Sequence, residues 1–156
     1  MKKPLLILLV LIWLLAACTA PSKDTEQAHQ TLIAFFDYLD KGEYSQADAL
    51  YGGGYEALTS FNPNIDPDDH TALWENGCRM SGLQCLTVRS ATLKEQRLDG
   101  KFVFTVEFSN PDGSPFILGP CCGATPTEMP PQSQFEYTVV EEAGKFLVMD
   151  LPVYMP

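Results

Sequence analysis

Residues 86–108, LTVRSATLKEQRLDGKFVFTVEF, decide the fold of this chain, because they predict two long strands joined by a tight turn. Polar and apolar residues alternate along 86–97, and Asp99-Gly100 is the strongest hairpin turn in the sequence. In the second strand, 101–108, the large apolar residues share one face: Phe102, Phe104, Val106 and Phe108. The stretch therefore predicts an antiparallel pair with an aromatic face.

Further strands are predicted after this hairpin. A turn at 110–113, NPDG, precedes a short strand at 116–118, and two final strands, 135–141 and 145–150, meet around Gly144. The loop 119–133 lies between them and carries four prolines with the adjacent Cys121 and Cys122. Ordered loops of this length are often functional, so we expect this one to cover a cavity or to connect the sheet to a helix.

Three helices are predicted before the sheet. The first begins at Asp24 or Thr25 and ends at Gly42, the second covers 43–50, and the third runs from Asp66-Pro67 to Asn76-Gly77. The first helix has an apolar face with residues three and four positions apart: Ala28, Leu32, Phe35, Phe36 and Leu39.

Helices first and antiparallel strands after them indicate an α+β fold. We expect three N-terminal helices packed on a curved antiparallel sheet of four to five strands. The aromatic face of 101–108 would be buried against Leu32, Phe35 and Phe36 of the first helix. The length of 24–156 suits a single domain.

The N-terminus has a pattern of its own. Lys2 and Lys3 precede an apolar run of 13 residues, 5–17, which ends in Leu15-Ala16-Ala17-Cys18. A membrane-spanning helix needs about 20 apolar residues, so the run is too short to span and is typical of a secretory signal.

This pattern resembles the signal peptide and lipobox of bacterial lipoproteins. The resemblance implies that residues 1–17 are removed, that Cys18 is linked to a diacylglycerol, and that 18–23 form a short tether. It places the protein on the extracytoplasmic face of a bacterial membrane, anchored by lipid. Ordinary secretion with an unmodified Cys18 is the alternative.

The chain is acidic, with 20 Asp and Glu against 10 Lys and Arg. Without Lys2 and Lys3 the net charge is near −12. Such a surface repels nucleic-acid phosphates and anionic lipid head groups. We therefore expect no nucleic-acid partner, and a membrane contact that depends on lipid rather than on charge.

Four cysteines remain besides Cys18: Cys78, Cys85, Cys121 and Cys122. An even number outside the cytosol suggests two disulfides. Bridges from 78 and 85 to 121 and 122 are favoured, because they close longer loops and avoid a strained bridge between neighbours. A local Cys78–Cys85 bridge is the alternative. A zinc site or a redox-active 121/122 pair is less favoured, since the usual Cys-x-x-Cys spacing is missing.

Residues 34–39, AFFDYL, and 41–47, KGEYSQA, resemble the opening of nuclear-transport-factor-two-like domains, and 144–150, GKFLVMD, resembles their last strand. Ketosteroid isomerases and polyketide cyclases share this cone-shaped α+β fold. The resemblance implies a cavity between sheet and helices, where the enzymes place an acid and a base. No such pair can be assigned here, because the inner face of 101–108 is apolar and Asp37 falls on the polar side of its helix.

The sequence contains no motif for catalysis, metal or cofactor binding, so we expect none of these. His29 and His70 are interpreted as solvated residues, and the acids at 66, 68 and 69 as helix caps rather than cation ligands. Aromatic residues are candidates for a pocket or its rim, although buried aromatics are also ordinary core residues: Tyr38, Tyr51, Tyr55, Trp74, Tyr137 and Tyr154.

The sequence thus predicts a non-catalytic, lipid-anchored cell-envelope protein. It would bind a small apolar ligand or an envelope protein through the cavity mouth or the 119–133 loop. The alternative is a cavity enzyme of the isomerase or polyketide-cyclase type. Buried acid and base groups that converge in the cavity would favour the enzyme, and a filled cone would leave a protein-interaction module.

Overall fold

The computed structural model describes residues 22–155, which form four helices and one antiparallel sheet of four strands. The helices are α2 (Lys23–Lys41), α3 (Tyr44–Asp48), α4 (Glu56–Phe61) and α5 (His70–Arg79). The strands are β1 (Thr87–Gln96), β2 (Lys101–Ser109), β3 (Phe135–Glu142) and β4 (Lys145–Val148). The α+β class is confirmed, with one helix more than predicted. The predicted signal peptide and Cys18 lie outside the described residues.

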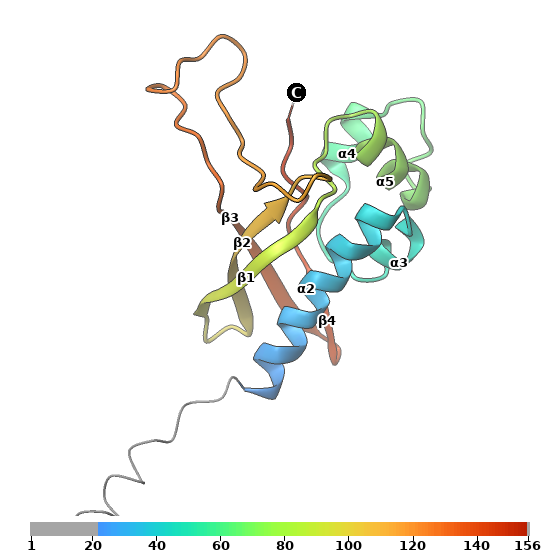
Figure 1. Cartoon of the computed structure of the whole chain (residues 1–156). Coiled ribbons are helices and arrows are strands. Elements are labelled where there is room, and N and C mark those ends of the chain that lie inside the picture. Colours follow the sequence, from blue (N-terminus) through green and yellow to red (C-terminus); the bar gives the residue numbers. More distant parts are fainter. Residues whose placement is uncertain (1–21, 156) are drawn as a thin grey trace, which may run out of the picture.

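The sheet has the order β1-β2-β3-β4, and each strand is antiparallel to the next. The predicted β1–β2 hairpin is confirmed: the Arg97 N–H donates to Lys101 O at 2.8 Å, and Gly100 has a φ of 80°, which glycine adopts without strain. The β3–β4 hairpin turns around Gly144, as predicted. Figure 1 shows α2 along one face of the sheet and the shorter helices beyond the C-terminal end of α2. The segment between β2 and β3 projects outward.

The predicted strand at 116–118 is wrong. Its backbone pairing is limited to isolated bridges, one of which joins Leu118 to Gln132. The Phe116 N–H donates to Phe108 O of β2 at 2.9 Å, but this pairing is not continued along 117–118 into a strand.

Helix α2 is the long amphipathic helix that its periodicity predicts. It starts earlier than expected, because the Ser22 side chain accepts a hydrogen bond from the Thr25 N–H at 3.1 Å and so caps the helix in place of Asp24 or Thr25. It ends at Gly42, which has a φ of 74°, as predicted. The apolar face is buried against the sheet.

The limits of the third predicted helix are wrong at both ends. Asp66 forms a local turn with the Asp68 N–H, and it is Asp69 that caps α5 by accepting from the Ala72 N–H at 3.1 Å. The helix also continues through Gly77. A Cβ at Gly77 would lie 2.8 Å from Leu83 Cδ1, so the glycine permits close approach here and does not end the helix.

Helix α4 was not predicted from the sequence. It is six residues long and has one buried side chain, Leu58. A helix this short shows too little periodicity to be recognised, and its formation depends on tertiary contacts with α5.

Candidate functional site

The concave side of the sheet is filled with aromatic side chains. Phe36 of α2 lies against Phe108 and Tyr137, with ring centroids 4.8 and 4.9 Å apart. Phe36, Phe104 and Phe108 are at most 1% exposed. Every buried side-chain nitrogen or oxygen in residues 22–155 has a hydrogen-bond partner. The buried polar side chains in this part of the chain are therefore all paired within the protein.

Tyr137, a candidate for the pocket, lies in this core. It is 2% exposed, and burial raises the pKa of its phenol far above the ordinary value. A phenol held neutral in this way fills space and does not serve as a base near neutral pH.

Three other aromatic candidates come together between α3 and α5. Tyr51 lies 5.3 Å from Tyr55 and 5.0 Å from Trp74, measured between ring centroids. The His70 ring stacks on Tyr55 at 3.7 Å with an interplanar angle of 8°. The His70 side chain is still 38% exposed, in line with its interpretation as a solvated residue, but one face of its ring is covered by Tyr55.

A hydrogen-bond network links this aromatic cluster to Asp48, which sequence reasoning missed. The Tyr55 hydroxyl donates to Asp48 Oδ1, and Trp74 Nε1–H donates to the Tyr55 oxygen at 3.1 Å. His70 Nδ1 lies 3.3 Å from the same Asp48 oxygen. Asp48 precedes its partners by 7 and 22 positions and belongs to no motif, so local sequence carries no signal for this contact.

Electrostatics keep both phenols of the cluster neutral. Burial raises the pKa of Tyr51 to about 12, with a further contribution from the negative charge of Asp150. Burial and the hydrogen bond to Asp48 also hold the pKa of Tyr55 well above its ordinary value. The cluster therefore joins α3, the 51–55 segment and α5, and its tyrosines are poor proton acceptors.

The second histidine, His29, is less solvated than predicted. His29 Nε2 lies 3.1 Å from Ala91 O, on the outer edge of β1, and its ring is 5.7 Å from Phe104. It is partly buried and lies across one free edge of the sheet, where an unpaired carbonyl would otherwise face solvent.

The acidic candidates make no metal centre. Asp66 and Asp69 are used in local turns and caps, and Asp37 forms an exposed ion pair with Lys41 at 2.6 Å. Within residues 22–155, no group of three or more His, Cys, Asp or Glu side chains is arranged to hold a metal ion.

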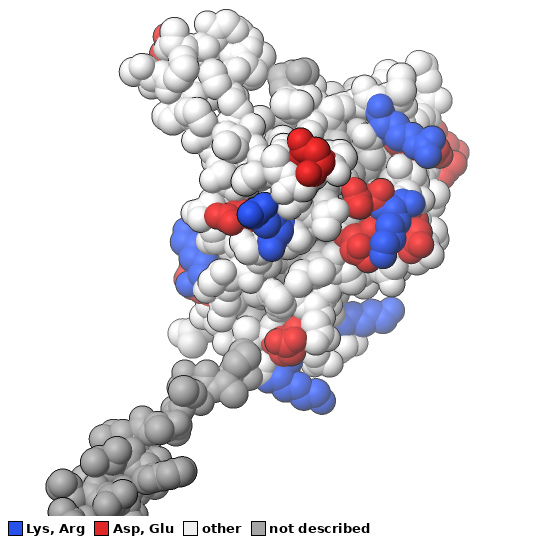
Figure 2. Space-filling model, viewed as in Figure 1, with Lys and Arg blue, Asp and Glu red and all other residues white. Residues whose placement is uncertain are grey.

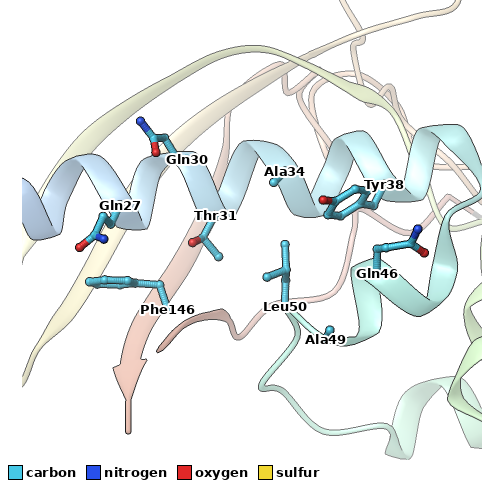
Figure 3. Close-up of a pocket in the computed structure, with 9 residues that line it drawn as sticks. All are labelled: Gln27, Gln30, Thr31, Ala34, Tyr38, Gln46, Ala49, Leu50 and Phe146. Carbon is cyan, nitrogen blue, oxygen red and sulfur yellow. The ribbon is translucent and has the colours of Figure 1, made fainter. Parts of the chain in front are cut away.

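An open groove of about 500 Å³ lies between α2, α3 and β4 (Figure 3). Tyr38 and Gln46 lie at one end, and Gln27 faces Phe146 near the other. The lining residues, none of them charged, are Gln27, Gln30, Thr31, Ala34, Tyr38, Gln46, Ala49, Leu50 and Phe146. Of the aromatic residues predicted to line a pocket, Tyr38 is the one that lines this groove.

Sequence reasoning assigned no role to Gln27 and Gln30 of α2. A signal was available, because Gln27, Thr31, Ala34 and Tyr38 form a second stripe at helical spacing that is small or polar but uncharged. Figure 2 shows acidic and basic side chains scattered over the visible face of the domain, often beside one another.

The cysteines pair differently from the favoured prediction. Cys78 and Cys85 form a disulfide with a Cα–Cα distance of 5.5 Å, so the crossing arrangement is wrong and the local alternative holds. The cause is the chain reversal after α5, where Asn76, Ser81 and Asn62 are joined by side-chain hydrogen bonds. Cys121 and Cys122 are free, on the projecting segment.

Two further observations concern membrane-spanning helices and similarity to known proteins. No helix in residues 22–155 is long and apolar enough to cross a membrane. No protein-family model, no curated protein and no solved structure matches this chain.

Proposed function

We propose that this chain is a non-catalytic lipoprotein of the bacterial cell envelope, and that its domain holds an extended segment of a partner protein in the groove between α2, α3 and β4. The observation that carries the proposal is the chemistry of the groove. Nine residues line it without one charge, on a chain with 20 acidic and 10 basic residues.

The free edge of β4 gives an extended segment a place to bind. The Val148 N–H donates to Leu50 O at 2.8 Å, and the Gly52 N–H donates to Val148 O at 2.9 Å, so Val148 is already paired on its outer side. Outward-facing backbone groups alternate along a strand, which directs the N–H and C=O of Phe146 to the same edge. A partner strand beside Phe146 would continue this pairing, as in strand addition.

The side chains around this edge select the partner's chemistry. Gln27 and Gln46 offer amide donors and acceptors, and Gln30 keeps its carbonyl oxygen free while its Nε2 donates to Glu26 at 2.8 Å. Ala34 and Leu50 supply an apolar floor. None of the nine lining residues carries a charge that could pair with a charged side chain placed here, so the groove favours an uncharged segment.

The other candidate functions have less support. A small apolar ligand would need interior space, and aromatic rings occupy the concave side of the sheet. A cavity enzyme would need converging acid and base groups there, whereas the Asp48–His70 pair lies between α3 and α5 with side chains 32% and 38% exposed. These features favour a protein-interaction module over both.

A photo-crosslinking amino acid at Thr31 tests the groove in intact cells. We expect a discrete adduct with a protein, identified by mass spectrometry as an extended uncharged segment. Ala34→Arg should reduce the adduct at least about tenfold, because it places a long charged side chain in the groove. Ile33→Arg is the matched control, since Ile33 is on the same helix, 38% exposed and outside the groove lining. An adduct with glycan, or one insensitive to Ala34→Arg, would exclude the proposed partner.

The lipid anchor is tested by Cys18→Ser. The variant should leave the membrane fraction and lose incorporation of labelled fatty acid, because each acyl CH₂ buried in the bilayer contributes about 0.8 kcal/mol and charge offers no substitute. Cys122→Ser, which keeps Cys18, should remain in the membrane fraction. Membrane retention of Cys18→Ser equal to that of the parent would refute the anchor.

A further inference from the structure

The segment 119–133 forms an arm between β2 and β3 (Figure 1). Two backbone hydrogen bonds between Leu118 and Gln132, of 2.8 and 2.9 Å, hold its base. Farther out, the Glu128 carboxylate accepts from the Thr125 N–H at 2.8 Å and from its hydroxyl at 2.9 Å. Figure 2 shows that the arm carries few charged groups. Internal hydrogen bonds thus order the arm, and it presents its cysteines away from the body of the domain.

Cys121 and Cys122 lie in a tight turn of this arm. The Ala124 N–H donates to Cys121 O at 2.9 Å, and Cys122 and Gly123 have φ values of 59° and 89°, as in a type I′ turn. A left-handed conformation is unfavourable for a residue with a Cβ. Within residues 22–155, Cys122 and Ala143 are the two non-glycine residues that adopt it. Such local strain persists most often at functional positions.

The two sulfur atoms are in contact and reachable. The Sγ atoms lie 2.8 Å apart, Cys122 is exposed and Cys121 is half-buried. We propose that Cys121 and Cys122 form a reversible thiol–disulfide exchange site, which is oxidised by an external disulfide and returned to the dithiol by a thiol reductant.

The adjacent positions of the two residues make the oxidised form easy to reduce. Consecutive Cα atoms are about 3.8 Å apart, whereas disulfides usually join Cα atoms about 4.4–6.8 Å apart. A bridge between neighbours is therefore strained, and strained or exposed bridges are the labile ones. Cys78–Cys85 has an ordinary Cα–Cα distance of 5.5 Å and serves as an internal reference.

The exchange balances in two steps. The Cys122 thiol loses its proton, and the thiolate attacks one sulfur of the external disulfide. A mixed disulfide forms, and the other half leaves as a thiolate that takes up a proton. The Cys121 thiolate then attacks the Cys122 sulfur, which closes the internal bridge and releases the second half as a thiol. In the dithiol, the hydrogen bond with Cys122 raises the pKa of Cys121, which disfavours Cys121 for the first attack; this hydrogen bond is lost once Cys122 is in the mixed disulfide.

The test is a redox titration of the full chain in glutathione buffers, with alkylation of free thiols and mass spectrometry of the peptides. We expect Cys121–Cys122 to become reduced at a reductant excess at least about tenfold lower than Cys78–Cys85 requires. Cys121→Ser should stop the exchange after the first step and leave one glutathione on Cys122. Cys78→Ser/Cys85→Ser should leave the 121–122 transition unchanged.

Oxidised glutathione and an oxidised Cys-x-x-Cys protein are offered in parallel, to distinguish a small-molecule oxidant from a protein oxidant. Oxidation of the pair by either one supports the site. Three results would overturn the proposal. The first is that Cys121 and Cys122 remain thiols in the most oxidising buffer, and the second is that each carries its own glutathione. The third is that their bridge is reduced together with Cys78–Cys85.

Discussion

Phe36→Ala is expected to destabilise the domain by about 3–5 kcal/mol. Phe36 is fully buried, and its ring lies 4.8–5.1 Å from the rings of Phe108, Tyr137 and Phe35. Its removal leaves a cavity between α2 and the sheet, where neighbouring aromatic rings can relax only in part. Domains are stable by about 5–15 kcal/mol, so the variant should approach the threshold of unfolding.

Thermal and urea unfolding followed by circular dichroism measures the effect. Ile33→Ala is the control, because Ile33 is on the same helix and 38% exposed, and we expect it to cost less than about 1 kcal/mol. A loss for Phe36→Ala no larger than that of Ile33→Ala would mean that α2 does not pack on the sheet in solution.

Removal of the local disulfide by Cys78→Ser/Cys85→Ser should cost about 2.5 kcal/mol, because the bridge closes a short loop with a sequence separation of 7. Cys121→Ser/Cys122→Ser should leave the free energy of unfolding within about 0.5 kcal/mol of the parent, since these cysteines lie on a projecting arm away from the core. The sequence alone predicted the opposite, a bridge from the 121/122 pair that stabilises the domain.

Urea unfolding of the two double variants decides between these arrangements. Equal losses in both would restore the crossing bridges, and a loss confined to the 121/122 variant would exclude the Cys78–Cys85 pairing. The losses in free energy of unfolding expected for the two double variants, about 2.5 and at most about 0.5 kcal/mol, differ by more than the error of a linear extrapolation for a small domain.

Much of the fold was predictable because it is encoded by neighbouring residues. The β1–β2 hairpin follows from alternation around Asp99-Gly100, and α2 follows from an apolar stripe that a glycine ends. The limits of α5 were not predictable, since Gly77 serves inside the helix as the place where Leu58 and Leu83 pack closely, and its neighbours in sequence carry no sign of this. Local residue preferences therefore gave the wrong helix end.

The candidate site was predictable to a smaller extent. Tyr51, Tyr55 and Trp74 were recognised as aromatic candidates, but their link to Asp48 and His70 depends on how α3 and α5 meet. The groove needs three elements, α2, α3 and β4, and its uncharged stripe has meaning only once Leu50 and Phe146 lie opposite.

The sequence by itself determined the α+β class, the two hairpins and the long helix α2, because periodicity and turn residues act over a few positions. It also determined the acidic character of the chain, which follows from composition. The tertiary structure alone decided that Cys78 pairs with Cys85 and that an uncharged groove lies beside β4. The groove depends on contacts between residues far apart in the chain, which follow from the burial of α2 on the sheet, and the Cys78–Cys85 pair depends on the chain reversal after α5.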